Sequence, residues 1–273
     1  MLLVIDVGNS NIAIGIFDGE KLRENWRLGT DVGKTADEFG ILFKELLVFS
    51  QVQREQIRGI VIASVVPPLL FPLEGLARKY FGIEPLLVEP GIKTGMTIHL
   101  DNPREVGADR IVNAVAGFEK YRTALIVIDF GTATTFDFVS SQGTFEGGVI
   151  APGLMISAEA LFRQASKLPR VELLRPKSVL GKNTITAMQA GIILGYAGLV
   201  DAVVRNLKAE IQESYPREPV PKVIATGGLV ELMARECPAI EVVEPNLTLE
   251  GLRLIYRRNR EGLRGGAVSD GSL

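Results

Sequence analysis

The sequence predicts an α/β protein built from two similar halves, and the main reason is a short stretch that occurs twice. Val4-Ile-Asp6-Val-Gly8 and Val127-Ile-Asp129-Phe-Gly131 share the pattern Val-Ile-Asp-x-Gly, 123 positions apart. In both copies a few small polar residues and then a β-branched run follow, which indicates a hairpin with a carboxylate at the end of its first strand. A length of 273 residues also exceeds that of a usual single domain.

The first half alternates strands and helices, which favours parallel pairing and a layered α/β domain. Its pattern predicts three strands over residues 2–28 and then a helix over 36–49, which begins with the capping box Thr35-Ala-Asp-Glu38. A buried strand at 60–65, a helix from Pro67 to about Tyr80 and a short strand at 86–88 are expected next. A polar irregular connection over 90–103 and a helix over 106–121 complete this half.

The second half repeats this scheme. The pattern predicts strands at 125–129, 133–139 and 144–150, a helix after Pro152-Gly153, a loop over 167–182, a long helix over 187–213, a strand at 223–226 that runs into a glycine turn and a short helix, and a last helix over 249–259. We therefore expect an N-terminal domain over residues 1–120 and a C-terminal domain over 121–260. The small, polar residues 261–273 are expected to form a disordered tail.

Composition excludes several classes of protein. Hydrophobic residues make up 47% and charged residues 23% of the chain, as in a globular protein, and the net charge is only −2 with scattered basic residues. No footprint for nucleic acid or an anionic membrane is therefore expected. No membrane span is expected, because no apolar run approaches the roughly 20 residues that cross a bilayer. A single cysteine, Cys237, excludes an intramolecular disulfide and fits a reducing, cytoplasmic location.

The two repeated turns carry the groups that bind phosphate. Asp6-Val-Gly8-Asn9-Ser10-Asn11 offers a carboxylate, a glycine that permits close approach, side-chain donors and backbone N–H groups at a bend. Such a turn can hold phosphate oxygens while the carboxylate holds Mg²⁺, mostly through water. Gly131-Thr132-Ala133-Thr134 offers the same groups, so a turn from each half would grip one nucleotide. A plain Asx turn is the alternative for either copy alone.

Two further motifs allow a functional and a purely structural interpretation. Gly227-Gly228 follows a buried strand, where glycines permit close approach of a ribose or flat ring, although a glycine pair is also common in ordinary turns. Asp109 in Gly107-Ala108-Asp109-Arg110 lies at a helix start, where aspartate is usually a cap. Beside an anionic site, Asp109 could instead accept the proton of an attacking alcohol, and Arg110 could hold an anion with its two-pronged side chain.

Other candidates are weaker as isolated motifs. The glycine-rich turns around Gly147 and Gly181 could line an acceptor pocket, but such turns are more often loops. His99, the only histidine, is expected on the surface. A Ser-His-Asp triad would have to use it, and no nucleophile-elbow, Walker or dinucleotide-binding motif occurs.

With these residues assembled, the sequence closely resembles the type III pantothenate kinases over about residues 1–258. These enzymes belong to the superfamily of acetate and sugar kinases, heat-shock chaperone ATPases and actin. The motifs that carry the resemblance are Asp6 to Asn11, Gly107 to Arg110, Asp129 to Thr135, Gly147 to Gly153 and Gly181 to Thr184. The resemblance implies duplicated ribonuclease H-like (actin-like ATPase) domains, each a mixed five-stranded sheet with flanking helices, with the nucleotide in the cleft between them.

The resemblance also implies roles for individual positions. The first ATP-phosphate segment would comprise Asp6, Val7, Gly8, Asn9, Ser10, Asn11, Ile12 and Ala13, with Asp6 nearest to Mg²⁺. Thr132 would contact ATP from the second segment, and Asp129 resembles the ligand of the monovalent cation, K⁺ or NH₄⁺. Asp109 resembles the proton acceptor. The pantothenate contacts would be Leu100, Gly107, Ala108, Asp109, Arg110 and Thr184, of which Thr184 comes from the partner subunit of a homodimer.

One position departs from the family, because many members carry tyrosine where this chain has Leu100. An apolar contact would then replace a hydrogen bond to pantothenate, which affects affinity more than reaction type. The leading hypothesis is an ATP:pantothenate phosphotransferase that acts first in coenzyme A synthesis. The alternatives are a non-catalytic nucleotide-binding accessory protein on the same fold and an ATP-driven conformational machine, although no long peptide-binding region is present.

Overall fold

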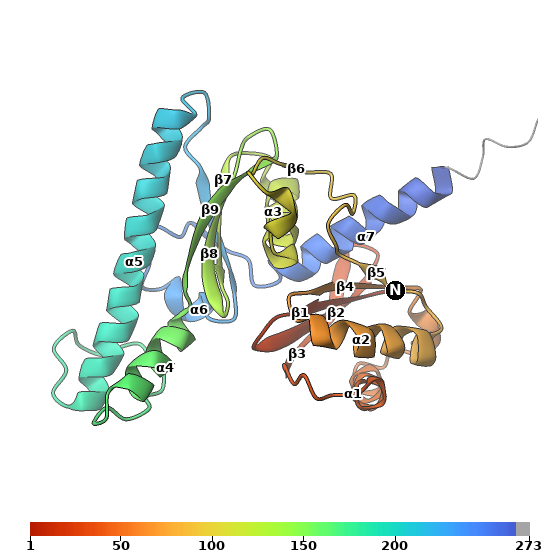
Figure 1. Ribbon diagram of the computed structural model, residues 1–273, viewed down its shortest axis with the longest axis horizontal. Helices are drawn as coiled ribbons and strands as arrows, with labels where there is room; N and C mark the ends of the chain where they lie inside the picture. Colours follow the sequence, from red (N-terminus) through yellow and green to blue (C-terminus); the bar gives the residue numbers. More distant parts are fainter. Residues whose placement is uncertain (266–273) are drawn as a thin grey trace, which may run out of the picture. The chain divides into compact units, whose positions relative to one another are not determined.

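The computed structural model describes residues 1–265, which divide into two compact units. Unit 1 comprises Met1–Gly95, Arg104–Ala116 and the chain from Thr248, and unit 2 comprises Met96–Pro103 and Gly117–Leu247. Figure 1 shows the elements of each unit along the chain. Each unit contains one mixed sheet flanked by helices, as the fold class requires.

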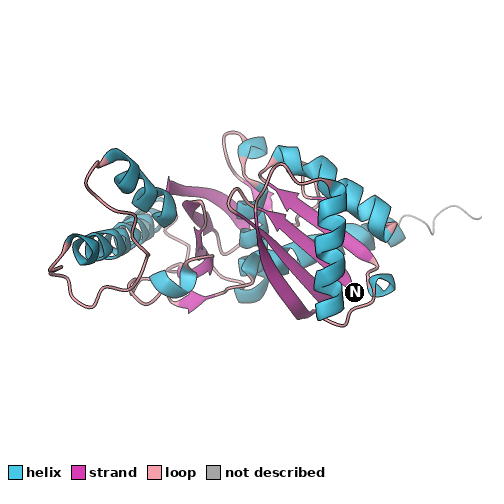
Figure 2. Cartoon of the chain, turned by 90° about the horizontal axis from the view of Figure 1, so that it is seen from below, coloured by secondary structure: helices cyan, strands magenta, loops and turns pink. Residues whose placement is uncertain are grey.

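The sheet of unit 1 has the strand order β3-β2-β1-β4-β5. Its strands are β1 (Leu2–Val7), β2 (Asn11–Asp18), β3 (Lys21–Gly29), β4 (Gly59–Ser64) and β5 (Leu86–Leu87). β1 to β3 form an antiparallel meander, whereas β4 pairs in parallel with both β1 and β5. Figure 2 shows these strands, beside the N-terminus, as one twisted sheet. The predicted strands of this half are thus confirmed.

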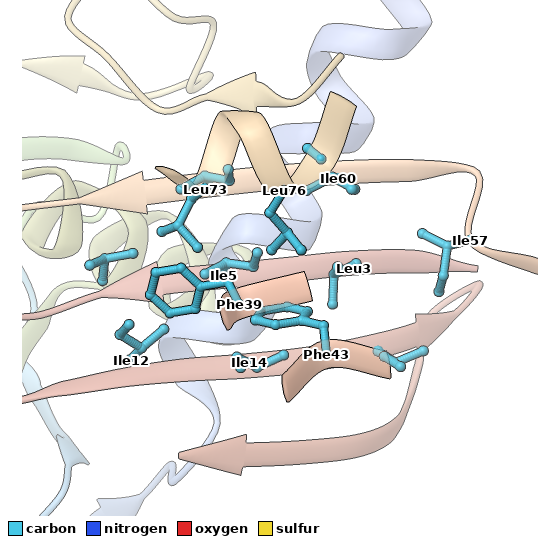
Figure 3. Close-up of a cluster of buried hydrophobic side chains, with 14 of the residues drawn as sticks. Leu3, Ile5, Ile12, Ile14, Phe39, Phe43, Ile57, Ile60, Leu73 and Leu76 are labelled. Atoms are coloured by element: carbon cyan, nitrogen blue, oxygen red, sulfur yellow. The ribbon is translucent and has the colours of Figure 1, made fainter. Parts of the chain in front are cut away.

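Helix α1 (Ala36–Phe49) begins where the capping box predicts. The Glu38 N–H donates to Thr35 Oγ1 at 3.3 Å, and the Thr35 N–H donates to the Glu38 carboxylate at 2.8 Å. Pro67–Leu69 forms a 3₁₀ turn before α2 (Leu70–Leu76), and a π-helical turn over Ala77–Phe81 follows. Figure 3 shows that side chains of α1 and α2 meet those of β1 and β2 in one core, among them Phe39, Phe43, Leu73, Leu76, Leu3, Ile5, Ile12 and Ile14.

The last helix, α7 (Leu247–Gly265), belongs to unit 1 from Thr248 onward, although the sequence analysis grouped residues 121–260 in the C-terminal domain. The reason is close packing: a Cβ at Gly251 would collide with the Val112 carbonyl, and one at Gly59 would collide with the Tyr256 ring. The helix also runs beyond the predicted end at 259, into the predicted tail. The rest of that tail, residues 266–273, lies outside the described residues.

The sheet of unit 2 repeats the order of the first and adds one strand, giving β11-β10-β7-β8-β9-β6. Its strands are β6 (Thr97–Ile98), β7 (Leu125–Phe130), β8 (Ala133–Val139), β9 (Thr144–Pro152), β10 (Lys222–Gly227) and β11 (Val242–Val243). β7 lies between antiparallel β8 and parallel β10, as β1 lies between β2 and β4. The duplication is therefore present in the topology.

Two strands in unit 2 were not predicted. β6 lies within the connection 90–103, which was expected to be irregular, and pairs in parallel with β9, so this sheet has six strands where five were expected. β11 pairs with β10. Each has only two residues, which is too short for an alternating pattern to be recognised.

The helices of unit 2 are α4 (Leu154–Gln164), α5 (Thr184–Ser214) and α6 (Val230–Met233), while α3 (Ala108–Tyr121) contributes residues to both units. α5 begins three residues earlier than expected because Asn183 Oδ1 accepts the Thr186 N–H at 2.9 Å and caps it. By length and composition alone α5 could cross a membrane, contrary to the expectation from the sequence. This is weak support for a span, because core helices pass the same test, and α5 contributes Ile193, Ala197 and Val200 to the core of unit 2.

Candidate active site

The first predicted phosphate turn joins β1 to β2. The Gly8 N–H donates to the Asn11 carbonyl at 3.0 Å and closes the turn, while Thr30 Oγ1 donates to the Gly8 carbonyl at 2.6 Å. Asn9, Ser10 and Asn11 are exposed, and Asp6 is half-buried at the end of β1. The exposed part of the turn therefore offers the amide, hydroxyl and N–H donors that an anion requires.

Not every residue of the expected ATP segment can present its side chain. Val7 and Ile12 are fully buried in the sheet, because successive strand residues point to opposite faces. Their side chains pack in the core of unit 1. Any contact from these two positions is therefore made by the backbone, whereas Asn9 and Ser10 can use side chains.

The second predicted turn joins β7 to β8 and is also closed by a bond from its glycine. The Gly131 N–H donates to the Ala133 carbonyl at 3.1 Å, the counterpart of the bond that closes the first turn. An added Cβ would lie 3.1 Å from the Asn11 carbonyl at Gly8 and 3.3 Å from the Ala133 carbonyl at Gly131. The repeated sequence thus forms a hydrogen-bonded hairpin in both units, and the second loop is one residue shorter than the first.

Thr132 is half-buried in this second turn, and its carbonyl accepts the Gly153 N–H at 3.1 Å. The interpretation that Thr134 also grips phosphate is wrong. Thr134 is fully buried, and its hydroxyl lies 2.6 Å from that of Tyr196 on α5. The side chain of Thr134 on β8 points into the core. Thr132 is therefore the residue of this turn whose hydroxyl group can face a ligand.

Asp129 and Gly227 lie together in unit 2. Asp129 on β7 pairs in register with Thr226 on β10, and a Cβ at Gly227 would lie 2.5 Å from Asp129 Oδ1. Gly227 also has φ +101°, a conformation that side chains disfavour. Gly227 is therefore needed both for the turn and for space beside the carboxylate, while the neighbouring Gly228 is exposed.

Asp109 lies in the first turn of α3, which begins at Ala108. Its Oδ1 accepts the Arg110 N–H at 2.8 Å, and a Cβ at Gly107 would lie 2.6 Å from the same oxygen. Asp109 is thus inside the helix rather than at the residue before it, so it is not the N-cap, although its carboxylate satisfies one first-turn donor. Gly107 to Arg110 are all partly exposed, so this carboxylate is accessible from solvent.

Leu100 belongs to unit 2, where it follows β6. Its Cδ2 would lie 3.4 Å from a Cβ at Gly147, which has φ +130°. The His99 N–H donates to the Phe145 carbonyl at 2.9 Å, and His99 Nδ1 lies 2.7 Å from Glu146 Oε2. His99 is exposed, as expected, and pairs with a carboxylate on β9. These contacts place Leu100 beside Gly147.

Thr184, the first residue of α5, is exposed. It lies in an open groove of about 690 Å³ in unit 2, lined by Leu161, Leu168, Gly181, Lys182, Asn183, Thr184, Ala187, Met188, Gly191 and Ile192. Gly181 has no room for a side chain, since a Cβ there would collide with Ala187. The Gly-x-Asn-Thr motif thus fixes the start of α5, and Thr184 lies exposed in the lining of the groove.

No group of three or more histidine, cysteine, aspartate or glutamate side chains within residues 1–265 could hold a metal ion. The acidic candidates, Asp6 and Asp129, are single carboxylates at strand ends. This donor set suits Mg²⁺, which keeps several waters and is bound by one or two carboxylates together with phosphate oxygens. It also suits a loosely held monovalent cation.

Thr30 was missed by the sequence analysis. It follows β3, far from the first turn in sequence, and no local pattern distinguishes it from any other threonine at a strand end. Only the register of β2 with β3, which pairs Asn11 with Gly29, brings it to the turn.

The architecture is that of the actin-like ATPases: two ribonuclease H-like sheets that share the order of five strands, each with a β-hairpin at its centre. Within this class, the chain belongs to the type III pantothenate kinase family, whose model matches residues 2–206.

Relatives in the family match over nearly their whole length. The chain is 60% identical to a type III pantothenate kinase of Geobacter sulfurreducens over 261 residues, covering 96% of this chain and 100% of the relative. It is 52% identical to one of Exiguobacterium over 261 residues, with the same coverage. These comparisons confirm the family that the motifs indicated.

Solved structures support the fold alone, because their identity to this chain is low. A Campylobacter jejuni protein described as a Baf family transcriptional activator has a TM-score of 0.56 and 18% identity, covering 95% of this chain and 99% of that one. An activator of the 2-hydroxyisocaproyl-CoA dehydratase from Clostridium difficile, with bound ADPNP, has a TM-score of 0.51 and 14% identity, covering 100% and 99%.

Proposed function

We propose that this chain transfers the γ-phosphoryl group of ATP to the primary hydroxyl of pantothenate, giving 4'-phosphopantothenate in the first step of coenzyme A synthesis. The observation that carries the proposal is membership of the type III pantothenate kinase family, with Asp6, Asp109, Arg110 and Asp129 all in place. An aspartate for the acceptor is what separates a kinase from a protein that only binds nucleotide.

In this proposal both hairpin turns hold the phosphates of one ATP. The segment from Asp6 to Ala13 supplies N–H and side-chain donors, and Thr132 adds a contact from the second turn. Gly227 and Gly228 leave space for the nucleoside. Phosphoryl transfer passes through a loose transition state, so positioning and neutralisation of charge contribute more than basicity.

Two cations complete the proposed site. Asp6 would hold Mg²⁺ through water, and Asp129 would bind K⁺ or NH₄⁺ beside Gly227, where a larger residue would collide with the carboxylate. When bound, the two ions supply positive charge that offsets the charge of the polyphosphate.

Pantothenate would lie against Gly107 to Arg110 and Leu100. Asp109 orients the primary hydroxyl and accepts its proton, while Arg110 holds the pantothenate carboxylate with two parallel N–H donors. Leu100, held beside Gly147, gives an apolar contact where many relatives have tyrosine. Thr184, exposed at the start of α5, would serve the site of the partner in a homodimer. We also propose a cytoplasmic location, where ATP and pantothenate are available.

ADP release with and without pantothenate, measured in potassium and then in sodium buffer, tests the proposal. We expect release that depends on pantothenate and is faster in potassium. The second candidate, a non-catalytic accessory protein, is raised by the likeness in fold to the Campylobacter jejuni protein described as a transcriptional activator. Nucleotide binding without pantothenate-dependent ADP release would favour it.

A further inference from the structure

Tyr196 is a buried tyrosine in the middle of α5, with 6% of its surface exposed. Its hydroxyl lies 2.6 Å from Thr134 Oγ1 on β8 and 2.9 Å from the Pro152 carbonyl oxygen at the end of β9. One side chain on a helix thus joins the ends of two neighbouring strands. No motif in the sequence marks this residue, and the proposed reaction does not use it directly.

The direction of these hydrogen bonds follows from the groups present. The Pro152 carbonyl can only accept, so the single proton of Tyr196 is donated to it, and the Thr134 hydroxyl donates to the Tyr196 oxygen. Burial raises the pKa of Tyr196, which keeps this proton in place. Tyr196 and Thr134 are buried, whereas Pro152 is exposed, so losing the Tyr196 hydroxyl would leave the buried Thr134 hydroxyl without this partner.

Thr134 and Pro152 flank the second phosphate turn. Ala133 pairs in register with Pro152, and the next residue, Gly153, donates its N–H to the Thr132 carbonyl at 3.1 Å. A side chain at Gly153 would collide with that carbonyl, so the two segments are in direct contact. The position of the Thr132 backbone therefore depends on where the β8 and β9 ends are held.

We propose that Tyr196 is a positioning residue for the nucleotide: through Thr134 and Pro152 it fixes the Gly131-Thr132 turn in the conformation that binds ATP phosphate. The inference rests on the proposed role of Thr132 in ATP binding. It adds that α5, through Tyr196, holds the turn that contains Thr132.

The test is Tyr196→Phe, which keeps the buried ring and removes only the hydroxyl. A typical hydrogen bond of this kind corresponds to about a 3- to 10-fold change in an equilibrium constant. We therefore expect the Kd of a non-hydrolysable ATP analogue, measured by calorimetry, and the KM for ATP to rise about 3- to 10-fold. The KM for pantothenate should change less than about 2-fold, because the two hydrogen bonds of Tyr196 go to Thr134 and Pro152 and not to a proposed pantothenate contact.

Tyr215→Phe is the matched control, since Tyr215 follows α5 and its hydroxyl lies 3.4 Å from Glu146, away from the turn. It should leave both KM values unchanged. Thr134→Val should reproduce Tyr196→Phe, and the double variant should be no weaker for ATP than either single one, because both changes break one network.

The inference is overturned if Tyr196→Phe binds the analogue as well as the parent chain does. It is also overturned if the KM values for ATP and pantothenate rise equally, which would indicate a general loss of structure. Analogue binding needs no acceptor, so it tests Tyr196 even where ADP release fails to respond to pantothenate. That failure would contradict the proposed function and leave the role of Tyr196 in nucleotide binding to be decided by calorimetry.

Discussion

Thr30 is hydrogen-bonded to Gly8 in the first hairpin turn. Its Oγ1 donates to the Gly8 carbonyl at 2.6 Å, and its backbone N–H donates to the Ser10 carbonyl at 3.1 Å. Two bonds from the residue after β3 therefore fix the backbone of the segment that is proposed to bind ATP phosphate. Such preorganisation reduces the ordering cost when a ligand binds.

Replacing Thr30 by valine should weaken nucleotide binding. The substitution removes one hydrogen bond and leaves the Gly8 carbonyl without this donor, so we expect the Kd of an ATP analogue to rise about 3- to 10-fold. Thr30→Ser keeps the hydroxyl and should bind within about 2-fold of the parent. Calorimetry compares the three chains, and equal affinity of the valine and serine variants would show that the Thr30 side chain does not hold the turn.

Asp109→Asn should lower turnover by orders of magnitude and spare ATP binding. The amide cannot accept the proton of the hydroxyl, and general-base catalysis contributes about 10²- to 10⁴-fold to rates. We expect kcat to fall by that order, with the Kd of the ATP analogue changed less than about 2-fold. Asp18→Asn, at an exposed turn, is the matched control. Equal losses in turnover and in ATP affinity would contradict the role of Asp109 as the residue that acts on the pantothenate hydroxyl.

Gly251→Ala should destabilise the chain. The added Cβ would collide with the carbonyl and side chain of Val112, so either α7 or α3 must shift. Overpacking of this kind costs about 1–3 kcal/mol of the free energy of unfolding, which chemical denaturation measures. Gly29→Ala, where nothing lies within 4 Å, is the control and should change it by less than about 0.5 kcal/mol. An unchanged free energy for Gly251→Ala would contradict the packing of α7 in unit 1.

Cys237 should be unreactive in the native protein at pH 8. Its side chain is fully buried, and burial, with smaller effects of the Asp201 and Glu236 carboxylates, raises the pKa of the thiol to about 12. The unfolded thiol has a pKa of about 8.5. Above that pH the thiol loses its proton in the unfolded chain but keeps it in the folded chain. Stability should fall as the pH rises between these two values. Iodoacetamide labelling followed by mass measurement should modify Cys237 only in denaturant, and rapid labelling without denaturant would contradict its burial.

The sequence contains enough information to predict the main strands, because Asp6 and Asp129 end two apolar runs of the same pattern and their turns use the same residue types. It does not predict β6 or β11, since two residues carry no period, nor the packing of α7 in unit 1, since that depends on the contact of Gly251 with Val112. Thr30 and Tyr196 could not be predicted either. Both act through contacts between residues far apart in the chain, which local patterns do not record.

The central claim is that the two hairpin turns bind the phosphates of a single ATP. Calorimetric titration of a non-hydrolysable ATP analogue into the parent chain, Ser10→Ala and Thr132→Val tests it most directly, because one change lies in each turn. We predict one site per chain in all three, with an affinity about 3- to 10-fold weaker in either variant. Two independent sites per chain, or an unchanged affinity when one of the turns is altered, would contradict the claim.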